Sequence, residues 1–185
     1  MANSLTSSVT IGATWDFHKT NTGLSDTVNN SSLSSKLSFS NGAGAGAAEE
    51  LYSAIRTLAG GATETLDLSG ALTNLVGDAA IAFTKIKAVI IELLSTTQDS
   101  TNGTAASSIS VGNAASNQAL LKADGGPLGA AAHTVTIPNG GWFAWGTTSA
   151  AGCTVANGAK DNLKVTNDDG AVTAAYRITL IGAKS

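Results

Sequence analysis

The chain has 185 residues, a mass of 18.3 kDa and a formal net charge of −3 at pH 7, which is enough length for one domain with its own core. Lys and Arg are scattered and form no basic stripe, so we expect no nucleic-acid binding. Charged residues make up only 12% of the chain and Gly occurs 21 times, a composition that favours short strands and turns and suits permanent assemblies.

Residues 1–48 contain little material for a hydrophobic core. The segment 8–17 (SVTIGATWDF) has the alternation of a strand, and 36–40 (KLSFS) offers a second, shorter one. The polar residues 20–36 are predicted as a low-complexity loop, and 41–48 (NGAGAGAA) as flexible chain. We therefore expect an N-terminal arm or hairpin at 1–48 that gains order by docking on neighbours.

Residues 49–58 (EELYSAIRTL) fit two structures. Their apolar spacing, the acids at their start and the Gly60-Gly61 pair at their end are typical of a helix, and local physics taken alone predicts one. In the segment 64–72, Leu66 and Leu68 alternate with polar neighbours, which predicts a strand that ends in a Ser-Gly turn.

The most apolar segment of the chain is 80–96 (AIAFTKIKAVIIELLST). A helix would place most of its large apolar residues on one face, but Val89 and Ile91 would then need a second buried face. Three isoleucines and a valine within six residues favour the pleated surface of a sheet. We predict a central strand that is more buried at its end than at its start.

The C-terminal half alternates between short strands and turns. After a polar loop at 96–105, strand-like segments occur at 107–113, 133–138, 142–148 and 153–158, with loop-like residues at 113–133. Asn139-Gly140-Gly141 predicts a hairpin turn between two of them, and residues 162–182 read as the clearest hairpin, around Asn167-Asp168-Asp169-Gly170. The sequence thus predicts an all-β fold, a β-sandwich or jelly-roll-like domain at 49–185 with an extended N-terminal arm at 1–48.

Three motifs carry a resemblance to a known group of proteins. They are the LDLSGALTN turn (66–74), the FTKIKAVII strand (83–91) and the terminal YRITLIG strand (176–182). Together the segments 56–97 and 161–182 resemble small virion structural proteins of tailed bacteriophages, over roughly the last two-thirds of the chain. The resemblance implies an extended segment before LDLSG, which favours a strand at 51–58. It is compatible with a capsid decoration (cement) protein and with a tail component.

From the resemblance and the composition we expect a non-enzymatic virion protein that stabilises a phage particle as a symmetric homo-oligomer, a trimer. Its expected partners are copies of itself and the major capsid protein or other virion proteins, with no cofactor, no metal and no nucleic acid. The N-terminus has no signal peptide and no apolar run is long enough to cross a bilayer, so we expect assembly in the host cytoplasm, no membrane contact and a final place in the virion.

Catalytic patterns are weak throughout. His18 and His133 are far apart, no GxSxG turn surrounds a serine, and the lone Cys153 is interpreted as a small buried residue. The glycines of 42–48 do not form a dinucleotide loop, because the full pattern is missing and two acids follow. The sequence Asn167–Gly170 lacks the ligand spacing of a calcium loop, and its Asp-Gly pair predicts the positive backbone angles of a tight hairpin.

Paired carboxylates for glycoside hydrolysis could be drawn from Asp16, Asp67 and Asp78 only by assuming a fold. A tail-associated hydrolase is therefore the least favoured class of function.

Aromatic residues are the remaining candidates for a binding site. The interface candidates are Trp15, Phe17, Trp142, Phe143 and Trp145. The first interpretation is an apolar contact at a sheet edge or between subunits. The alternative is a carbohydrate- or receptor-binding module, at a tail or on the head surface, that stacks the sugar rings of a host surface glycan on Trp142 and Trp145.

Overall fold

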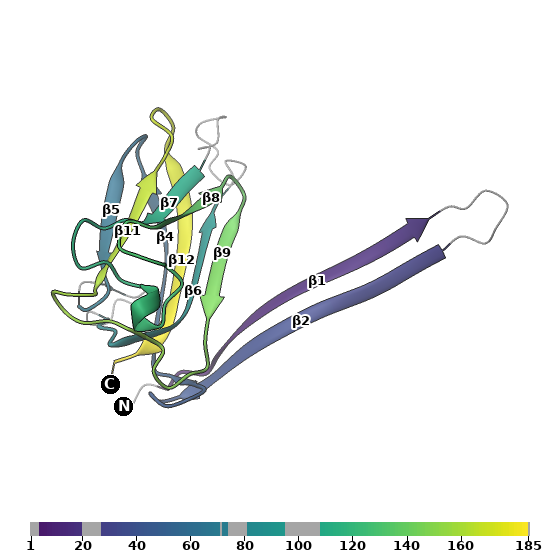
Figure 1. Cartoon of the computed structure of the whole chain (residues 1–185), viewed down its shortest axis with the longest axis horizontal. Helices are drawn as coiled ribbons and strands as arrows, with labels where there is room; N and C mark the ends of the chain where they lie inside the picture. The colour runs from purple at the N-terminus through teal and green to yellow at the C-terminus, as the bar shows by residue number, and fades with distance from the viewer. Residues whose placement is uncertain (1–3, 20–26, 71, 74–80, 95–107, 185) are drawn as a thin grey trace.

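The computed structural model describes residues 4–19, 27–70, 72–73, 81–94 and 108–184, with the backbone alone at 16–19 and 27–30. Within these ranges the chain is all-β, with several antiparallel sheets and a short 3₁₀ turn at Lys122–Asp124 as the only helical element (Figure 1). The all-β prediction is confirmed. No helix that could span a bilayer occurs in the described part of the chain.

Two sheets form the body of the protein. One has five strands, in the order β10 (Cys153–Thr154), β6 (Lys85–Leu93), β12 (Ala174–Ala183) and β4 (Glu50–Leu58), with β9 (Trp142–Gly146) also paired to β6. The other has four strands, in the order β5 (Thr63–Asp67), β11 (Asn162–Asn167), β7 (Ser108–Gly112) and β8 (Thr134–Pro138).

The two sheets pack face to face as a β-sandwich. Alternate residues of each strand point inward, so that Leu163 and Val165 of β11 and Tyr176, Ile178 and Leu180 of β12 belong to one buried cluster. Each of these side chains is fully buried. Burial of alternating apolar residues from both sheets is the main stabilising term of such a fold.

The two ambiguous segments are both strands. β4 pairs with β12 from Glu50 to Leu58, although the spacing of its apolar residues is helical. Pairing with β12 buries Tyr52 and Leu58 in the sandwich, and this tertiary burial outweighs the local helical preference. β6 lies between β12 and β9, as expected of a central strand.

Both predicted hairpins of the C-terminal half are wrong. β8 pairs with β7 and β9 pairs with β6, so the turn at Asn139–Gly141 connects one sheet to the other. In the same way β11 belongs to the four-stranded sheet and β12 to the five-stranded sheet. The alternation and the turn residues predict two strands and a reversal of direction, but they do not distinguish neighbours in one sheet from strands that face each other across a core.

The β11–β12 connection is held by a buried side chain. Asn167 donates hydrogen bonds through Nδ2 to the carbonyl oxygens of Leu58 (3.2 Å), Ala59 (3.0 Å) and Val172 (2.7 Å), and its Oδ1 accepts one from the Asp169 N–H (3.1 Å). Gly170 does not adopt a positive φ, so the predicted backbone angles of a tight Asp-Gly hairpin are absent. The connection crosses between sheets instead of closing a two-residue turn.

Lys87 is a buried lysine inside the most apolar strand. The register between β6 and β12 shifts at Ile181/Gly182, where Lys87 has no partner on β12. Its Nζ donates hydrogen bonds to the carbonyl oxygens of Ser149 and Ala150, the latter at 2.8 Å. Burial lowers the pKa of Lys87, and the charge of Lys85 adds to this. The ammonium ties the loop after β9 to the sheet.

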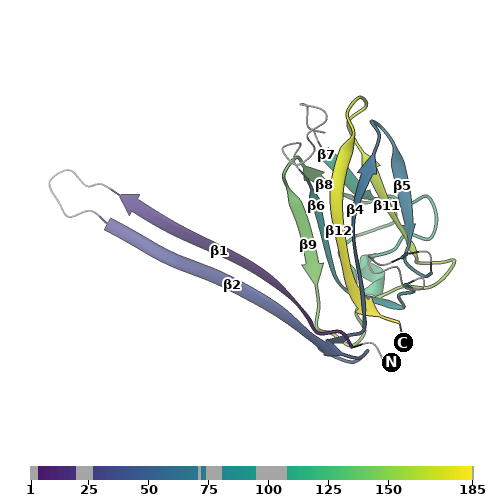
Figure 2. The same cartoon turned by 180° about the vertical axis from the view of Figure 1, so that it is seen from behind.

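The N-terminal strands form a long hairpin that extends away from the sandwich (Figures 1 and 2). β1 (Ser7–Lys19) pairs with β2 (Thr27–Asn41) along its whole length, and β2 also pairs with β3 (Ala47–Ala48). The loop predicted at 20–36 is therefore wrong from residue 27 onward, because pairing with β1 satisfies the backbone of a Ser- and Asn-rich segment. Residues 20–26 lie outside the described ranges.

Candidate functional site

The β1–β2 hairpin carries its apolar side chains on one face. Its register places the odd-numbered residues of both strands on the same side. Near the sandwich, Val9 and Phe39 on this side are buried against Ala88 and Ile181, while Leu37 is partly buried there. Further out, the same side carries four residues that we call the distal stripe: Ile11, Ala13, Trp15 and Leu33.

The distal stripe is unpartnered. Leu33 is 65% exposed, and Ile11 and Trp15 are also exposed. The opposite side of the hairpin carries hydroxyl groups, glycine and Lys36 among its described side chains, as an ordinary solvated surface does. A polar strand pair with one apolar side is amphipathic, and its apolar side is suited to contact another surface.

A second exposed apolar surface lies on the outer face of the five-stranded sheet. The strand register aligns its outward-pointing residues in three rows. The outer row is Ile55, Arg177, Glu92 and Trp142, the middle row is Ser53, Thr179, Ile90 and Ala144, and the root row is Leu51, Ile181, Ala88 and Gly146. The hairpin covers Ile181, Ala88 and Gly146 of the root row, where a Cβ on Gly146 would lie 2.5 Å from Leu37 Cδ1. Ile90 of the middle row is partly buried against the same cluster, whereas Leu51 at the end of the root row is 40% exposed.

The two ends of the outer row are apolar and exposed. Ile55 is 59% exposed and Trp142 is 58% exposed. Between them the guanidinium of Arg177 and the carboxylate of Glu92 form an ion pair at 3.2 Å, so the charges of the row neutralise each other. The Ser53 and Thr179 hydroxyl groups are hydrogen-bonded at 3.0 Å in the middle row. The free part of this face is therefore apolar at its edges and neutral at its centre.

The predicted aromatic cluster is divided between two faces. Trp142 points outward, whereas Phe143 and Trp145 pack against the core of the sandwich. Trp142 and Trp145 are three positions apart in a strand, so they point to opposite sides of the sheet and form no shared stacking platform. Trp15 lies on the distal stripe. The backbone of Phe17 belongs to β1, but its side chain lies outside those described.

Sequence reasoning missed Ile11, Leu33 and Ile55 as surface residues. The alternation of apolar and polar residues in β1 can be seen in the sequence. Its partner strand, however, is predicted as a loop, so the sequence does not show that the stripe continues through Leu33. Ile55 was counted as part of an apolar helical face. The signal that could have found them is an apolar residue placed alternately among Ser and Thr in a segment without other core material.

A polar network closes one edge of the sandwich. Glu64 accepts hydrogen bonds from Tyr176 Oη and from Arg56 Nε (2.7 Å), and Arg56 Nη1 donates to Tyr52 Oη (3.2 Å). The hydrogen bond with Glu64 raises the pKa of Arg56, while burial, followed by the bond to Glu64, raises the pKa of Tyr176. The network keeps Arg56 charged and Tyr176 protonated.

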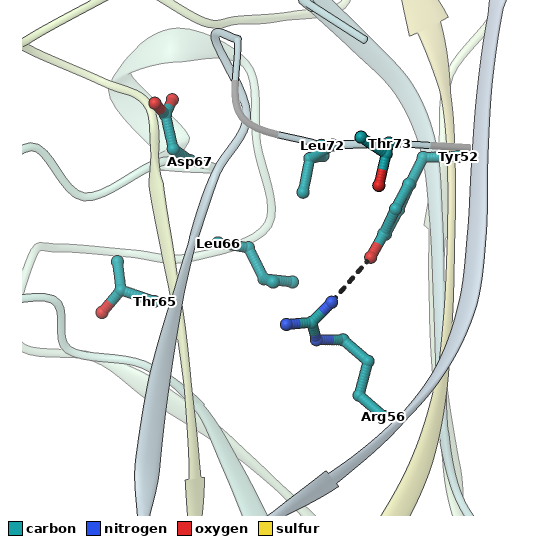
Figure 3. Close-up of a pocket in the computed structure, with 7 residues that line it drawn as sticks. All are labelled: Tyr52, Arg56, Thr65, Leu66, Asp67, Leu72 and Thr73. Atoms are coloured by element: carbon teal, nitrogen blue, oxygen red, sulfur yellow. Dashed lines mark hydrogen bonds between the residues drawn. The ribbon is translucent and has the colours of Figure 1, made fainter. Parts of the chain in front are cut away.

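A cavity of about 160 Å³ adjoins this network, lined in part by Tyr52, Arg56, Asp67 and Leu72. Figure 3 shows the Tyr52 hydroxyl facing the Arg56 guanidinium, while Asp67 points away from it. Asp67 Oδ1 accepts hydrogen bonds from the backbone and the hydroxyl of Ser69. Small-molecule sites usually exceed roughly 300 Å³, and Tyr52, Arg56 and Asp67 already have hydrogen-bond partners within the protein, so the cavity is interpreted as a structural feature.

We expect Glu64→Ala to lower the free energy of unfolding by about 2 kcal/mol, because it leaves the buried Tyr176 hydroxyl and the Arg56 guanidinium without their acceptor. The matched control is Glu92→Ala, which removes an exposed Glu–Arg pair from the outer face of the five-stranded sheet and is expected to cost at most about 0.5 kcal/mol. Urea unfolding followed by circular dichroism measures both. Equal losses in the two variants would contradict a structural role for the network.

The other candidates from the sequence form no site. His133 is exposed, and Cys153 is a free cysteine that is fully buried, with its pKa raised to about 11 mainly by burial. No group of three or more His, Cys, Asp or Glu that could hold a metal ion occurs among the described residues. The side chains of Asp16 and His18, and all of Asp78, lie outside the described part of the chain.

Comparison of the chain with protein-family models, with curated proteins and with solved structures gave no match. Within the described part of the chain, the two exposed apolar surfaces are the features best suited to bind a partner.

Proposed function

We propose that this protein is a structural subunit that stabilises a larger assembly through its β1–β2 hairpin, which acts as an N-terminal arm. The observation that carries the proposal is the distal stripe, a row of exposed apolar side chains on a hairpin whose root is fixed to the sandwich. An isolated two-stranded hairpin is marginally stable in water, so a long one gains most from a partner surface.

The energetics favour a permanent contact. Covering a half-exposed Leu, Ile or Trp side chain stabilises a complex by about 1 kcal/mol or more, and the stripe and the outer face offer several such residues. In a closed assembly each subunit both gives and receives such contacts, so modest contributions act together. The network around Glu64 has the role of holding the sandwich edge and performs no reaction in this proposal.

The proposed setting is a bacteriophage virion, and the LDLSGALTN, FTKIKAVII and YRITLIG motifs support it by resemblance. In this proposal the protein is a capsid decoration (cement) protein with jelly-roll-like connectivity, active as a trimer and bound to the major capsid protein or another virion protein. A tail-associated structural role is the alternative placement. A density map of an intact particle into which the chain can be traced tests the placement.

Shortening the arm tests the role of the hairpin. Deleting residues 13–33 and joining Gly12 to Ser34 through Asn-Gly keeps the root and its strand pairing, because Gly12 and Ser34 are register partners. We expect at least about tenfold weaker association with the assembly and an unchanged urea midpoint of the sandwich. Sedimentation velocity and incorporation into particles are the measurements. Unchanged association and incorporation would rule out the arm as the anchor.

The exposed side chain of Trp142 favours a second candidate, a glycan- or receptor-binding module. Trp142→Ala would then abolish binding on a glycan array while the protein stays folded. Trp145 points into the core and cannot complete a platform with Trp142, which makes this candidate weaker. An array without any binding by the wild-type chain would remove it.

A further inference from the structure

We propose that the distal stripe of the arm seats on the free outer face of the five-stranded sheet of a second copy of this chain. The inference rests on the proposed function and names the surface that receives the arm. The contact joins two different surfaces, stripe to face, so it is head-to-tail and generates a ring when the rotation closes.

A contact of the same kind, between the apolar side of the hairpin and the outer face of the sheet, already occurs within one chain. At the root of the hairpin, Val9, Leu37 and Phe39 pack on Ala88 and Ile181, which belong to the outer face. The distal stripe continues the same side of the same hairpin, and the middle and outer rows continue the same face of the same sheet. The distal stripe and the free outer face are thus continuations of the two surfaces that pack against each other at the root of the hairpin.

The stripe cannot seat on its own sheet. Figures 1 and 2 show the hairpin diverging from β9 as it leaves the sandwich, so the stripe and the outer row of one chain lie apart. The distance from Ile11 to Trp15 along β1 is about 13 Å, and the distance from Ile55 to Trp142 across three inter-strand spacings is about 14 Å. A stripe from a second copy therefore matches the width of the free face.

The chemistry of the two surfaces also agrees. The distal stripe and the two Ser residues beside it, Ser31 and Ser35, carry no charge. The charges of the face are paired within it, between Arg177 and Glu92, so that a neutral partner leaves neither charge alone. A strongly acidic or basic partner would gain little from such a face.

The test uses one variant on each surface of the full-length chain. Leu33→Asp places a charge on the stripe, and Ile55→Asp adds a second carboxylate beside the Arg177–Glu92 pair of the face. Each is expected to weaken self-association about a hundredfold, because the contact would then bury a net negative charge. Matched controls are Ser34→Asp, on the opposite side of the hairpin, and Thr65→Asp, on the exposed side of the four-stranded sheet. Both controls are expected to associate as the wild type does in sedimentation velocity.

Mixing the two variants separates a stripe-to-face contact from a stripe-to-stripe contact. Each variant alone is expected to be monomeric, and an equimolar mixture is expected to give a 1:1 pair, because Leu33→Asp keeps its face and Ile55→Asp keeps its stripe. Association of Ile55→Asp alone at wild-type strength, or a mixture that stays monomeric at a hundredfold higher concentration, would overturn the inference.

Failure of the inference and failure of the proposed function are distinguishable. A wild-type chain that is monomeric at all concentrations overturns the contact between copies. The structural role falls only if the chain is also absent from particles.

Discussion

Asn167→Asp is expected to lower the free energy of unfolding by about 4 kcal/mol. The side chain of Asn167 is fully buried, and its Nδ2 donates to the carbonyl oxygens of Leu58, Ala59 and Val172. An aspartate carboxylate has the same shape but no N–H to donate, so it would place a negatively charged oxygen next to these three carbonyl oxygens in a buried site. Urea unfolding at pH 7, followed by circular dichroism, measures the loss.

The pH dependence of this variant follows from the same geometry. A buried carboxyl without a cationic partner has a raised pKa in the folded protein, so its protonated form is the one that folding favours. Stability is therefore expected to rise as the pH falls towards 5, because the protonated group regains one donor. The control is Asn162→Asp on the same strand, whose Nδ2 makes one exposed bond of 3.3 Å to Ser116 and which is expected to lose less than about 1 kcal/mol. Similar losses in the two variants would refute the role of Asn167.

Gly182→Ala is expected to lower the free energy of unfolding by about 3 kcal/mol. Gly182 lies where the register between β12 and β6 shifts, and an added Cβ would lie 2.1 Å from the carbonyl oxygen of Lys85 and 2.8 Å from Phe83 Cδ1. The first of these atoms belongs to the backbone of the central strand, so the strain can be relieved only by moving the sheet. Thermal unfolding by calorimetry measures the effect.

Gly170→Ala is the matched control for this substitution. An added Cβ at Gly170 meets no atom within 4 Å, and its φ lies outside the left-handed region. The expected change is within about 0.5 kcal/mol of zero. A large loss at Gly170 would show that the β11–β12 connection needs the positive φ that its sequence suggests.

Strand positions were largely predictable from the sequence, because each strand of the sandwich buries alternate residues. Apolar residues occur at every second position in β11 (Leu163 and Val165) and β12 (Tyr176, Ile178 and Leu180) because one face of each strand is buried. β4 was predictable only through the resemblance, since its own apolar spacing is helical. Its strand conformation depends on β12, whose partner residues are more than 100 positions away in the chain.

The pairing of strands was less predictable than their positions. The local sequence does not distinguish the Asn139-Gly140-Gly141 turn, which crosses between sheets, from a hairpin turn. The difference lies in the distant strands with which β8 and β9 pair, β7 and β6 respectively. Lys87 could not be recognised as buried either, since its partners are carbonyl groups of a loop more than 60 residues away. Side chains that bind backbone atoms leave no complementary residue type in the sequence.

Only some residues of the two exposed apolar surfaces could be selected from the sequence. Trp15 and Trp142 were selected because they are aromatic, and both are exposed. Trp145 was grouped with Trp142 by proximity in sequence, although the pleat of β9 separates them. Leu33 was missed because a single leucine among serines and asparagines carries no pattern until its register partner, Ala13, is known.

The position of β12 has a consequence for biosynthesis. This strand lies between β4 and β6, yet it follows both of them in the chain and is translated after them. Until it emerges, β4 and β6 lack the neighbour that joins them, and the apolar residues of both are uncovered in the nascent polypeptide. Synthesis that stops before residue 174 would therefore release an aggregation-prone fragment.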